Sequence, residues 1–305
     1  MKKKILTTIR RIVGVQDLKA RVMKQTKFNL YEMRRFQLMD HILNDHQSGI
    51  TSERYTDHDI IVSLTTYGKR INDVAFTIES IMQQTIRANK IVLWLDNSFE
   101  HKRLPESLLR QRERGLEIAF CKDIRSYTKL IPSLSRYPDA AIITVDDDIL
   151  YDYDLLERLI IPYIEDPQYI YCHRYHKMTL DKNGSLMPYK KWYWQCMEQE
   201  PSHLNFATGV GGVLYPPHSL DEETTNEQVF LDICKYADDV WFKAMAIKKG
   251  TLVKLVYSRN QQGQDYILND SVQDMGLKNI NIIGGQNDLQ IKAVFEKYNL
   301  YNHLR

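Results

Sequence analysis

The sequence predicts an α/β fold in which a mostly parallel sheet is flanked by helices and follows a basic N-terminal helical extension. Three observations carry this prediction. From residue 59 onwards, short apolar runs alternate with amphipathic stretches, and such a β-α-β order is typical of a parallel sheet. One apolar run ends in three consecutive aspartates at residues 146–148. Residues 1–35 contain eleven lysines and arginines against two acidic residues.

The composition is that of a folded globular protein. Of the 305 residues, 43% are hydrophobic, which suffices for one large α/β domain with extensions or for two small domains. Four cysteines without C-x-x-C spacing favour neither a zinc site nor a disulfide framework. With no secretory signal pattern and no apolar stretch of about 20 residues, we expect a cytoplasmic protein, or a peripheral one on the inner face of the plasma membrane.

The extension has the pattern of a basic amphipathic helix. Ile5, Ile9, Leu18 and Val22 recur at helical spacing, with lysines and arginines between them. Such a helix can lie on an anionic membrane surface through residues 1–35. A surface helix that packs on the domain or on a partner chain is an equally weighted alternative. Nucleic-acid binding is disfavoured, because the basic residues lack interleaved aromatic side chains and the remainder of the chain is acidic.

The first half of the predicted domain alternates strands and helices. In chain order we expect a strand at 60–65, a helix at 74–82, a strand at 90–96, a helix at 104–114, a strand at 116–120, a short helix at 127–136 and a strand at 140–145. No G-x-G-x-x-G follows the first strand, and no G-x-x-x-x-G-K-[ST] occurs, so neither a Rossmann-type dinucleotide site nor a P-loop is favoured.

The second half is less regular. A helix follows Asp152, which can serve as its N-cap, and residues 165–237 are then rich in Tyr, Trp, Pro and Gly. We expect an apolar strand at 206–217, whose three glycines indicate that another group approaches the backbone closely. We then expect a helix that ends at Gly250. A last helix begins near Asp288, and we expect Asp288 to cap that helix.

The aspartates at 146–148 are the strongest chemical signal. Side chains at the carboxyl ends of strands in an open α/β sheet face a ligand rather than the core. We expect Asp146 and Asp148 to point to the same side, because side chains alternate along a strand. One or two carboxylates suit Mg²⁺ and leave coordination positions for phosphate oxygens. The alternative, a simple cap for the next helix, needs no run of three mutually repelling carboxylates.

Two other polar segments are candidates for the same edge. The first strand runs into Thr65–Arg70, a short loop with an aromatic residue that can stack on a nucleobase. Asp238 and Asp239 begin a predicted helix, where carboxylates are also good capping groups. One of the two can cap the helix while the other projects into a site.

Five features occur in the order that one enzyme family uses: Val62–Tyr67, Lys129–Leu134, the aspartates at 146–148, the glycine-rich Gly209–Tyr215, and Ala237–Asp239. In them the chain resembles the GT-A-fold glycosyltransferases of bacterial polysaccharide synthesis, which are family-2-like, with features also seen in exostosin-like enzymes. The resemblance covers residues 58–250. It implies a basic helical extension at 1–57 and a catalytic domain at 58–305, with a nucleotide-binding half at 58–150 and a donor-sugar and acceptor half at 151–305.

The resemblance implies a nucleotide-sugar donor, in the first place a UDP-sugar, held through Mn²⁺ or Mg²⁺, and a saccharide or lipid-linked saccharide acceptor. The implied donor-binding residues are Thr65, Thr66, Tyr67, Arg70, Lys129, Asp146, Asp147, Gly211 and Gly212. Asp148 is the implied direct metal ligand, with Asp146 beside it. Asp239, next to Asp238, matches the position of the acceptor's base in inverting members. No histidine is assigned as a ligand.

Other interpretations stay open. A retaining mechanism would use the same metal site, and Asp239 would then only orient the acceptor. A Mg²⁺-dependent nucleotidyl- or phosphotransferase also uses carboxylates at such an edge, although it would normally show a glycine-rich loop after the first strand. A non-catalytic envelope-assembly protein that retains the fold is the third alternative.

Overall fold

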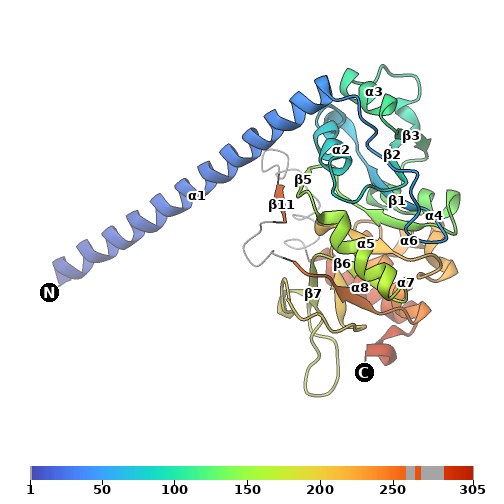
Figure 1. Cartoon of the computed structure of the whole chain (residues 1–305). Helices are drawn as coiled ribbons and strands as arrows, with labels where there is room; N and C mark the ends of the chain where they lie inside the picture. The colour runs from blue at the N-terminus through green and yellow to red at the C-terminus, as the bar shows by residue number, and fades with distance from the viewer. Residues whose placement is uncertain (1, 259–264, 269–284, 305) are drawn as a thin grey trace.

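The computed structural model describes residues 2–258, 265–268 and 285–304, with side chains described from residue 18 onwards. A central sheet of seven strands runs in the order β10-β6-β9-β4-β1-β2-β3 (Figure 1). Its strands are β1 (Ile60–Thr65), β2 (Lys90–Asp96), β3 (Leu116–Cys121), β4 (Ala141–Thr144), β6 (Ile170–Cys172), β9 (Val213–Tyr215) and β10 (Val253–Leu255). All neighbours pair in parallel except β9, which is antiparallel to β4 and β6. The predicted α/β fold with a mostly parallel sheet is confirmed.

Helices cover both faces of the sheet. They are α2 (Val74–Met82), α3 (Glu106–Glu113), α4 (Ile131–Arg136), α5 (Leu155–Glu165), α6 (Glu227–Ile233), α7 (Asp238–Lys249) and α8 (Gln286–Lys297). Val62 and Leu64 pack into a core with α2, α3 and α5, whereas Ile61 packs into a second core with α7 and α8. Because both faces are buried, the strands read as continuous apolar runs, and the predicted bounds of β1 and β2 are correct to the residue.

Two predicted elements differ from the structure. The helix expected at 127–136 is divided at Leu130 into a 3-10 helix (Arg125–Lys129) and α4, with Pro132 in the first turn, where its missing N–H costs nothing. The apolar strand expected at 206–217 is interrupted. Its glycines form a 3-10 turn (Gly209–Gly211) between β8 (Asn205–Ala207), which pairs with β7 (Tyr175–Lys177), and β9.

Chain topology places a switch point between β1 and β4. From β1 the chain adds β2 and β3 on one side, then returns to place β4 on the other side of β1. The two strands stay paired to their carboxyl ends, where the Val145 N–H donates to the Ser63 carbonyl at 3.1 Å. The crevice outside such a switch point is where open α/β sheets bind ligands.

The N-terminal helix α1 (Lys2–Asn44) extends away from the domain and joins it through its last turns (Figure 1). Leu38 and Ile42 are buried against α2 and α3, so this part is a packing helix. Leu18 and Val22 are exposed, while Ile5 and Ile9 fall among the side chains that lie outside the description. Among the described residues, no helix combines the length and apolarity that crossing a membrane requires. The domain boundary at 57/58 stays a prediction.

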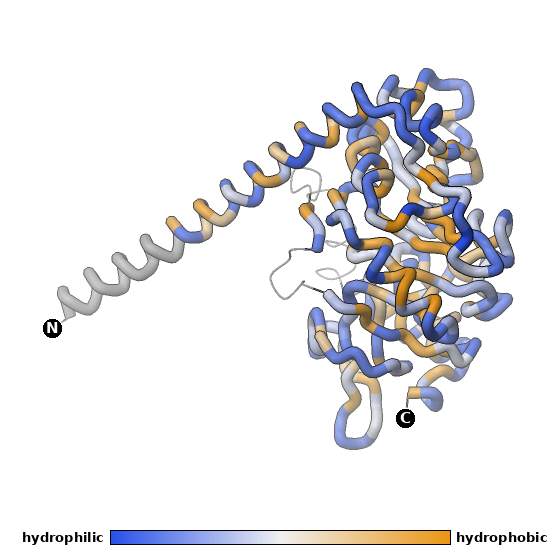
Figure 2. The backbone as a smooth tube through the Cα atoms, viewed as in Figure 1, coloured by the Kyte–Doolittle hydropathy of each residue, from blue (hydrophilic) through white to orange (hydrophobic). Residues whose placement is uncertain are grey.

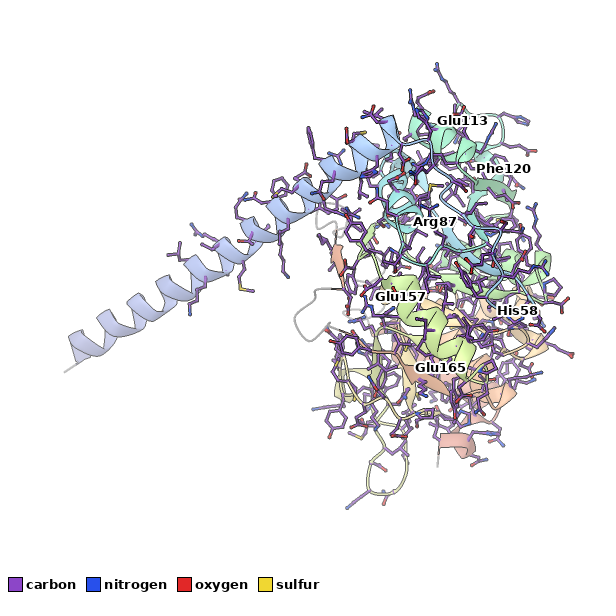
Figure 3. The ribbon with its side chains drawn as sticks, viewed as in Figure 1. His58, Arg87, Glu113, Phe120, Glu157 and Glu165 are labelled. Atoms are coloured by element: carbon purple, nitrogen blue, oxygen red, sulfur yellow. The ribbon has the colours of Figure 1, made fainter. Side chains whose placement is uncertain are left out.

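Polar contacts fasten the segments around the sheet. His58, which is labelled in Figure 3, lies just before β1. Its Nε2 contacts the hydroxyl of Tyr163 on α5 at 2.5 Å. At the other end of the domain, Arg114 contacts both oxygens of Glu79, at 2.9 and 3.0 Å, and Asp45 at 3.1 Å. The Glu79 side chain is fully buried, so Arg114 holds α1, α2 and α3 together through a buried ion pair.

Replacing Arg114 with leucine should destabilise the fold by about 3–5 kcal/mol, because it leaves the buried Glu79 charge without its ion-pair partner. Urea denaturation measures the loss. Arg110→Leu, at a half-exposed arginine of α3, the helix that Arg114 follows, is the control and should cost less than about 1 kcal/mol. A second substitution, Glu79→Leu, should recover most of the lost stability. Equal effects at both arginines would contradict the assignment.

Candidate functional site

The candidate site lies at the carboxyl ends of β1 and β4. The loop after β1 carries Thr66 and Arg70, and the aspartates at 146–148 follow β4. Two segments from the second half reach the same edge: the glycine turn before β9 and the start of α7. The structure therefore brings together four segments that are far apart in the sequence.

Arg70 organises one part of the site. Its guanidinium lies 2.7 Å from Asp147 and 3.3 Å from Asp148, and the Thr66 hydroxyl donates to Asp147 at 2.6 Å. The Tyr67 ring is 53% exposed beside Arg70, whereas the Thr65 hydroxyl donates to the Trp94 carbonyl at 3.0 Å. Of the three predicted nucleoside-pocket residues, Tyr67 thus offers an open ring, while both threonine hydroxyls already have acceptors within the protein.

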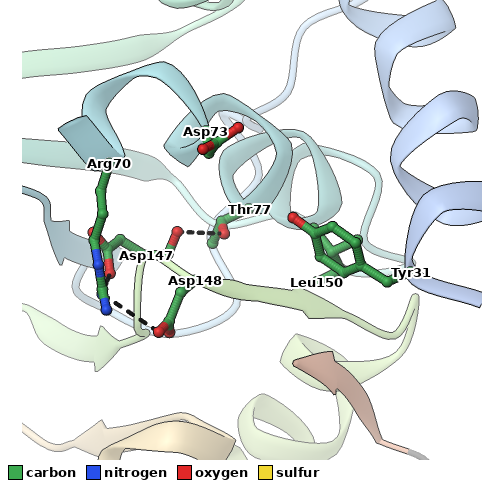
Figure 4. A pocket seen from close by; sticks show the side chains of 7 residues that line it. All are labelled: Tyr31, Arg70, Asp73, Thr77, Asp147, Asp148 and Leu150. Carbon is green, nitrogen blue, oxygen red and sulfur yellow. Dashed lines mark hydrogen bonds and ion pairs between the residues drawn. The ribbon is translucent and has the colours of Figure 1, made fainter. Parts of the chain in front are cut away.

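A small cavity opens beside this group. Figure 4 shows its lining, with Arg70 turned towards Asp148 and the Thr77 hydroxyl donating to the backbone carbonyl of Asp147 at 3.0 Å. Tyr31 of α1 forms the opposite wall. Burial, and after it the charge of Asp73, raises the pKa of Tyr31 to about 12. Its hydroxyl therefore keeps its proton and can donate a hydrogen bond at neutral pH.

Lys129 organises the other part. Its ammonium group contacts Asp146 at 3.0 Å and Asp238 at 3.1 Å, which joins the end of β4 to the first turn of α7. Burial alone would lower the pKa of Lys129, but the charges of Asp146 and Asp238 outweigh it and hold the pKa well above its usual value. Lys129 therefore stays a cation between carboxylates. Asp239 completes this part by accepting a hydrogen bond from the Gly209 N–H at 3.4 Å.

The three aspartates do not continue the strand. Asp147 and Asp148 form a turn, so the alternation expected for an extended segment ends at Asp146. As a result Asp147 and Asp148 both face Arg70, and Asp146 faces Lys129. The expectation that Asp146 and Asp148 share one side rested on the alternation of side chains along a strand. That reason is wrong, because Asp147 and Asp148 lie in a turn. Asp146 and Asp148 remain close enough to repel each other, because the charge of Asp146, after burial, contributes to the raised pKa of Asp148.

Of the three glycines before β9, one borders the charged groups of the site and two have structural roles. A Cβ at Gly209 would lie 2.7 Å from the Lys129 ammonium and 3.4 Å from an Asp146 oxygen, so this backbone approaches the charged groups closely. Gly211 instead packs against Arg174 and His173, and Gly212 has a φ of 84°, which favours glycine. The glycine that borders the charged groups is thus Gly209, whereas sequence reasoning named Gly211 and Gly212.

The predicted caps have other partners. Asp152 accepts from the Tyr153 N–H at 2.9 Å, and α5 begins only after Asp154. Asp288 lies inside α8 and accepts from the Tyr189 N–H at 2.7 Å, which fastens the last helix to the aromatic segment. Asp238 and Asp239 lie in the first turn of α7, where negative charge is favourable, but their oxygens face Lys129 and Gly209.

Three carboxylates of the site have raised pKa values, with burial as the first cause in each. Burial raises the pKa of Asp147. Burial, followed by the charges of Asp146 and Asp147, raises the pKa of Asp148 to about 6. Burial, followed by the charge of Asp238, raises the pKa of Asp239 to about 7. Perturbed carboxylates at a ligand-binding edge are typical of functional sites. Of Asp148 and Asp239, Asp239 has the pKa closer to neutral pH.

The site offers carboxylate oxygens, the ligand type that a divalent cation takes, although among the described side chains no three of these carboxylates converge on one point. Five carboxylates, at 146–148, 238 and 239, lie around two cations, Arg70 and Lys129, each of which already contacts two of them. Burial and then the repulsion from Asp146 and Asp147 raise the pKa of Asp148, and a bound cation would relieve the repulsion. Mg²⁺ and Mn²⁺ accept such oxygen ligands and keep positions for phosphate oxygens. Asp148 and Asp146 are the residues that would hold the ion.

A second acidic group does not fit a metal. Among the side chains that the structure describes, three potential ligands converge at His41, Asp45 and Glu79. Arg114 already lies between the two carboxylates of this group and neutralises them. We therefore assign this group to the packing of α1 on the domain.

Sequence reasoning missed three residues of the site. The Tyr151 hydroxyl accepts from the Asp146 N–H at 2.9 Å and holds the turn in place. Gly209 belongs to the glycine-rich segment for which a close backbone approach was predicted. The sequence did not identify Lys129 as the group that approaches it. Tyr31 gave no local signal, because its position depends on how α1 packs.

Compared with known proteins, the chain matches no family model and no curated protein.

Proposed function

We propose that this protein is a metal-dependent glycosyltransferase, which moves a sugar from a nucleotide-sugar donor to a saccharide or lipid-linked saccharide acceptor in surface polysaccharide synthesis. A UDP-sugar is the donor proposed first, and we propose inversion at the anomeric carbon with Asp239 as base. One observation carries the proposal: Lys129 and Gly209 join the aspartates after β4 to the start of α7 at the switch point of the sheet. A donor-binding edge and a carboxylate with a pKa near 7 thus lie in one site.

The donor side is supported by charge and by an exposed aromatic ring. Arg70 and Lys129 supply positive charge next to the aspartates, where a diphosphate would lie, and the exposed Tyr67 ring can stack on a base. A Mn²⁺ or Mg²⁺ ion held by Asp148 and Asp146 would supply Lewis-acid stabilisation of the departing diphosphate. The cationic side chains add electrostatic stabilisation to the same developing charge.

The acceptor side rests on Asp239. In the proposed reaction the acceptor oxygen forms a bond to the anomeric carbon, the bond from that carbon to the diphosphate oxygen breaks, and the nucleoside diphosphate takes the electron pair. The acceptor hydroxyl proton passes to Asp239. A general base works best when its pKa is near the working pH, and burial raises the pKa of Asp239 to about 7. The Gly209 N–H, at 3.4 Å, orients the carboxylate.

Product analysis tests the proposal. The protein is incubated with Mn²⁺, a mixture of saccharide acceptors and a panel of nucleotide-sugars labelled in the sugar. We expect the label to appear in a longer saccharide, with release of an equal amount of nucleoside diphosphate. Transfer of a nucleotide or phosphate to the acceptor would instead identify a nucleotidyl- or phosphotransferase. No turnover of any donor by a protein that also binds no nucleotide would favour a non-catalytic role.

Substitutions at two neighbouring glycines should separate function from folding. In Gly209→Ala the added Cβ displaces the Lys129 ammonium, which lies at the end of a flexible side chain, so we expect near-normal melting but at least tenfold less sugar transfer. Gly212→Ala meets no atom closer than 3.7 Å but strains a backbone with φ of 84°, so it should lower stability by about 1–3 kcal/mol. Melting curves and transfer rates measure both. Unchanged transfer by Gly209→Ala would remove this glycine from the site.

A further inference from the structure

Helix α1 carries apolar side chains that are buried against the domain and others that are exposed. Tyr31, Leu38 and Ile42 are buried against the domain. With 3.6 residues per turn, Val22 and Phe36 fall on the opposite side of the helix, about 160° away. They are 55% and 82% exposed. Figure 2 shows hydrophobic positions recurring along the described part of α1 beyond its contact with the domain.

The exposed apolar side chains of the protein concentrate on this helix. Among the described residues, half of the exposed large apolar side chains belong to α1: Leu18, Val22, Met23, Phe28, Leu30, Met33, Phe36, Met39 and Leu43. Single exposed apolar residues need no explanation, but such a concentration indicates a surface that contacts another molecule. We call these nine residues the α1 apolar surface. They occupy more than half of the helix circumference, with polar residues such as Asn29 and Glu32 among them.

The positive charge of α1 favours an anionic partner. Residues 1–35 hold eleven basic and two acidic residues, and Lys19, Lys24 and Lys27 lie exposed beside the α1 apolar surface. Two copies of the helix would repel each other, and a two-helix seam through Val22, Phe36 and Leu43 would bury polar residues between them, such as Asn29. At a membrane interface, amide side chains remain hydrated while lysines meet anionic headgroups.

We propose that the α1 apolar surface and its flanking lysines bind an anionic lipid surface. Tyr31 lines the same cavity as Arg70 and Asp148, so the part of α1 that packs on the domain reaches the candidate site. Lipid binding through α1 therefore holds this site next to the membrane. The proposal does not depend on the glycosyltransferase assignment, because it rests on the exposure and charge of α1 alone.

Vesicle flotation tests it with the full-length protein. We expect binding to vesicles that contain phosphatidylglycerol, loss of binding at high salt, and weak binding to vesicles of phosphatidylcholine alone. Val22→Glu with Phe36→Glu removes apolar contacts at exposed positions, and Lys19→Glu with Lys24→Glu and Lys27→Glu reverses the charge. Each variant should bind at least roughly tenfold more weakly. Leu289→Glu, at a 62% exposed leucine on α8, is the matched control and should bind like the wild type.

Two results would overturn the proposal. The first is equal binding of wild-type protein, charge-reversed variant and apolar-surface variant to anionic vesicles, or no binding by any of them. The second is a concentration-dependent dimer, measured by sedimentation in the absence of lipid, that Val22→Glu with Phe36→Glu dissociates, because the surface would then bind a second copy. Nucleotide binding measured in the same variants distinguishes a failure of the lipid-binding proposal from a failure of the glycosyltransferase proposal. It should be unchanged whether or not lipid binds.

Discussion

Asp148→Asn should abolish the stabilisation that a nucleoside diphosphate and Mn²⁺ give to the protein, and should abolish sugar transfer with it. Asparagine keeps the shape of the side chain but removes the charge that would hold the cation. A ligand at a hundred times its Kd stabilises the native state by about 2.7 kcal/mol, so the wild type should show a clear rise in melting temperature with UDP and Mn²⁺. The variant should show none.

The same substitution should stabilise the ligand-free protein. The pKa of Asp148 is raised to about 6 in the folded state, so the folded carboxyl holds its proton at pH values where the unfolded one has lost it. Stability is therefore lost as the pH rises from the unfolded to the folded pKa, and the neutral amide of the variant removes that loss, by about 3 kcal/mol at neutral pH. Asp232→Asn, at an exposed aspartate of α6, is the control. A variant that keeps the ligand-dependent rise would exclude Asp148 as the metal ligand.

Asp239→Asn should lower kcat by about 100- to 10,000-fold while leaving the stabilisation by UDP and Mn²⁺ intact. Asparagine still accepts the Gly209 hydrogen bond but cannot take the acceptor's proton. For the same reason the wild-type rate should fall as the pH drops through about 7, where the carboxyl with its raised pKa becomes protonated. Rates across this pH range, with donor binding measured in parallel, test both statements.

A different outcome at Asp239 would change the mechanism. If Asp239→Asn loses only a few-fold in rate and the wild-type profile is flat near pH 7, Asp239 orients the acceptor and does not accept its proton. The anomeric configuration of the product, read by NMR, decides between the two stereochemical classes. Inversion is the result that the proposed role of Asp239 requires.

Much of the fold follows from local patterns in the sequence. The apolar runs of β1 and β2 give their bounds to the residue, and Gly250 ends α7 in the left-handed conformation that favours glycine. The strand at Phe206 was predicted too long, because apolar residues continue through a turn whose shape depends on glycine backbone angles. Periodicity reports which face of an element is buried, but it does not report where a strand leaves its sheet.

The candidate site was predictable only in part. The aspartates at 146–148, Arg70 and Lys129 were recognisable by type and order, yet the pairing of Lys129 with both Asp146 and Asp238 joins segments that are distant in the sequence. The turn at Asp147, which aims two aspartates at Arg70, is held by tertiary contacts from Thr66 and Thr77. Such contacts depend on packing and leave no local pattern.

Calorimetric titration of the wild-type protein with UDP, once with Mn²⁺ and once with a chelator, tests the central claim most directly. The claim is that Asp146 and Asp148 hold a cation that binds a diphosphate at the switch point of the sheet. It predicts binding with Mn²⁺ and loss of that binding with the chelator or after Asp148→Asn. Binding of equal strength with and without the metal, or no binding of UDP or any other nucleoside diphosphate with Mn²⁺ present, would contradict it.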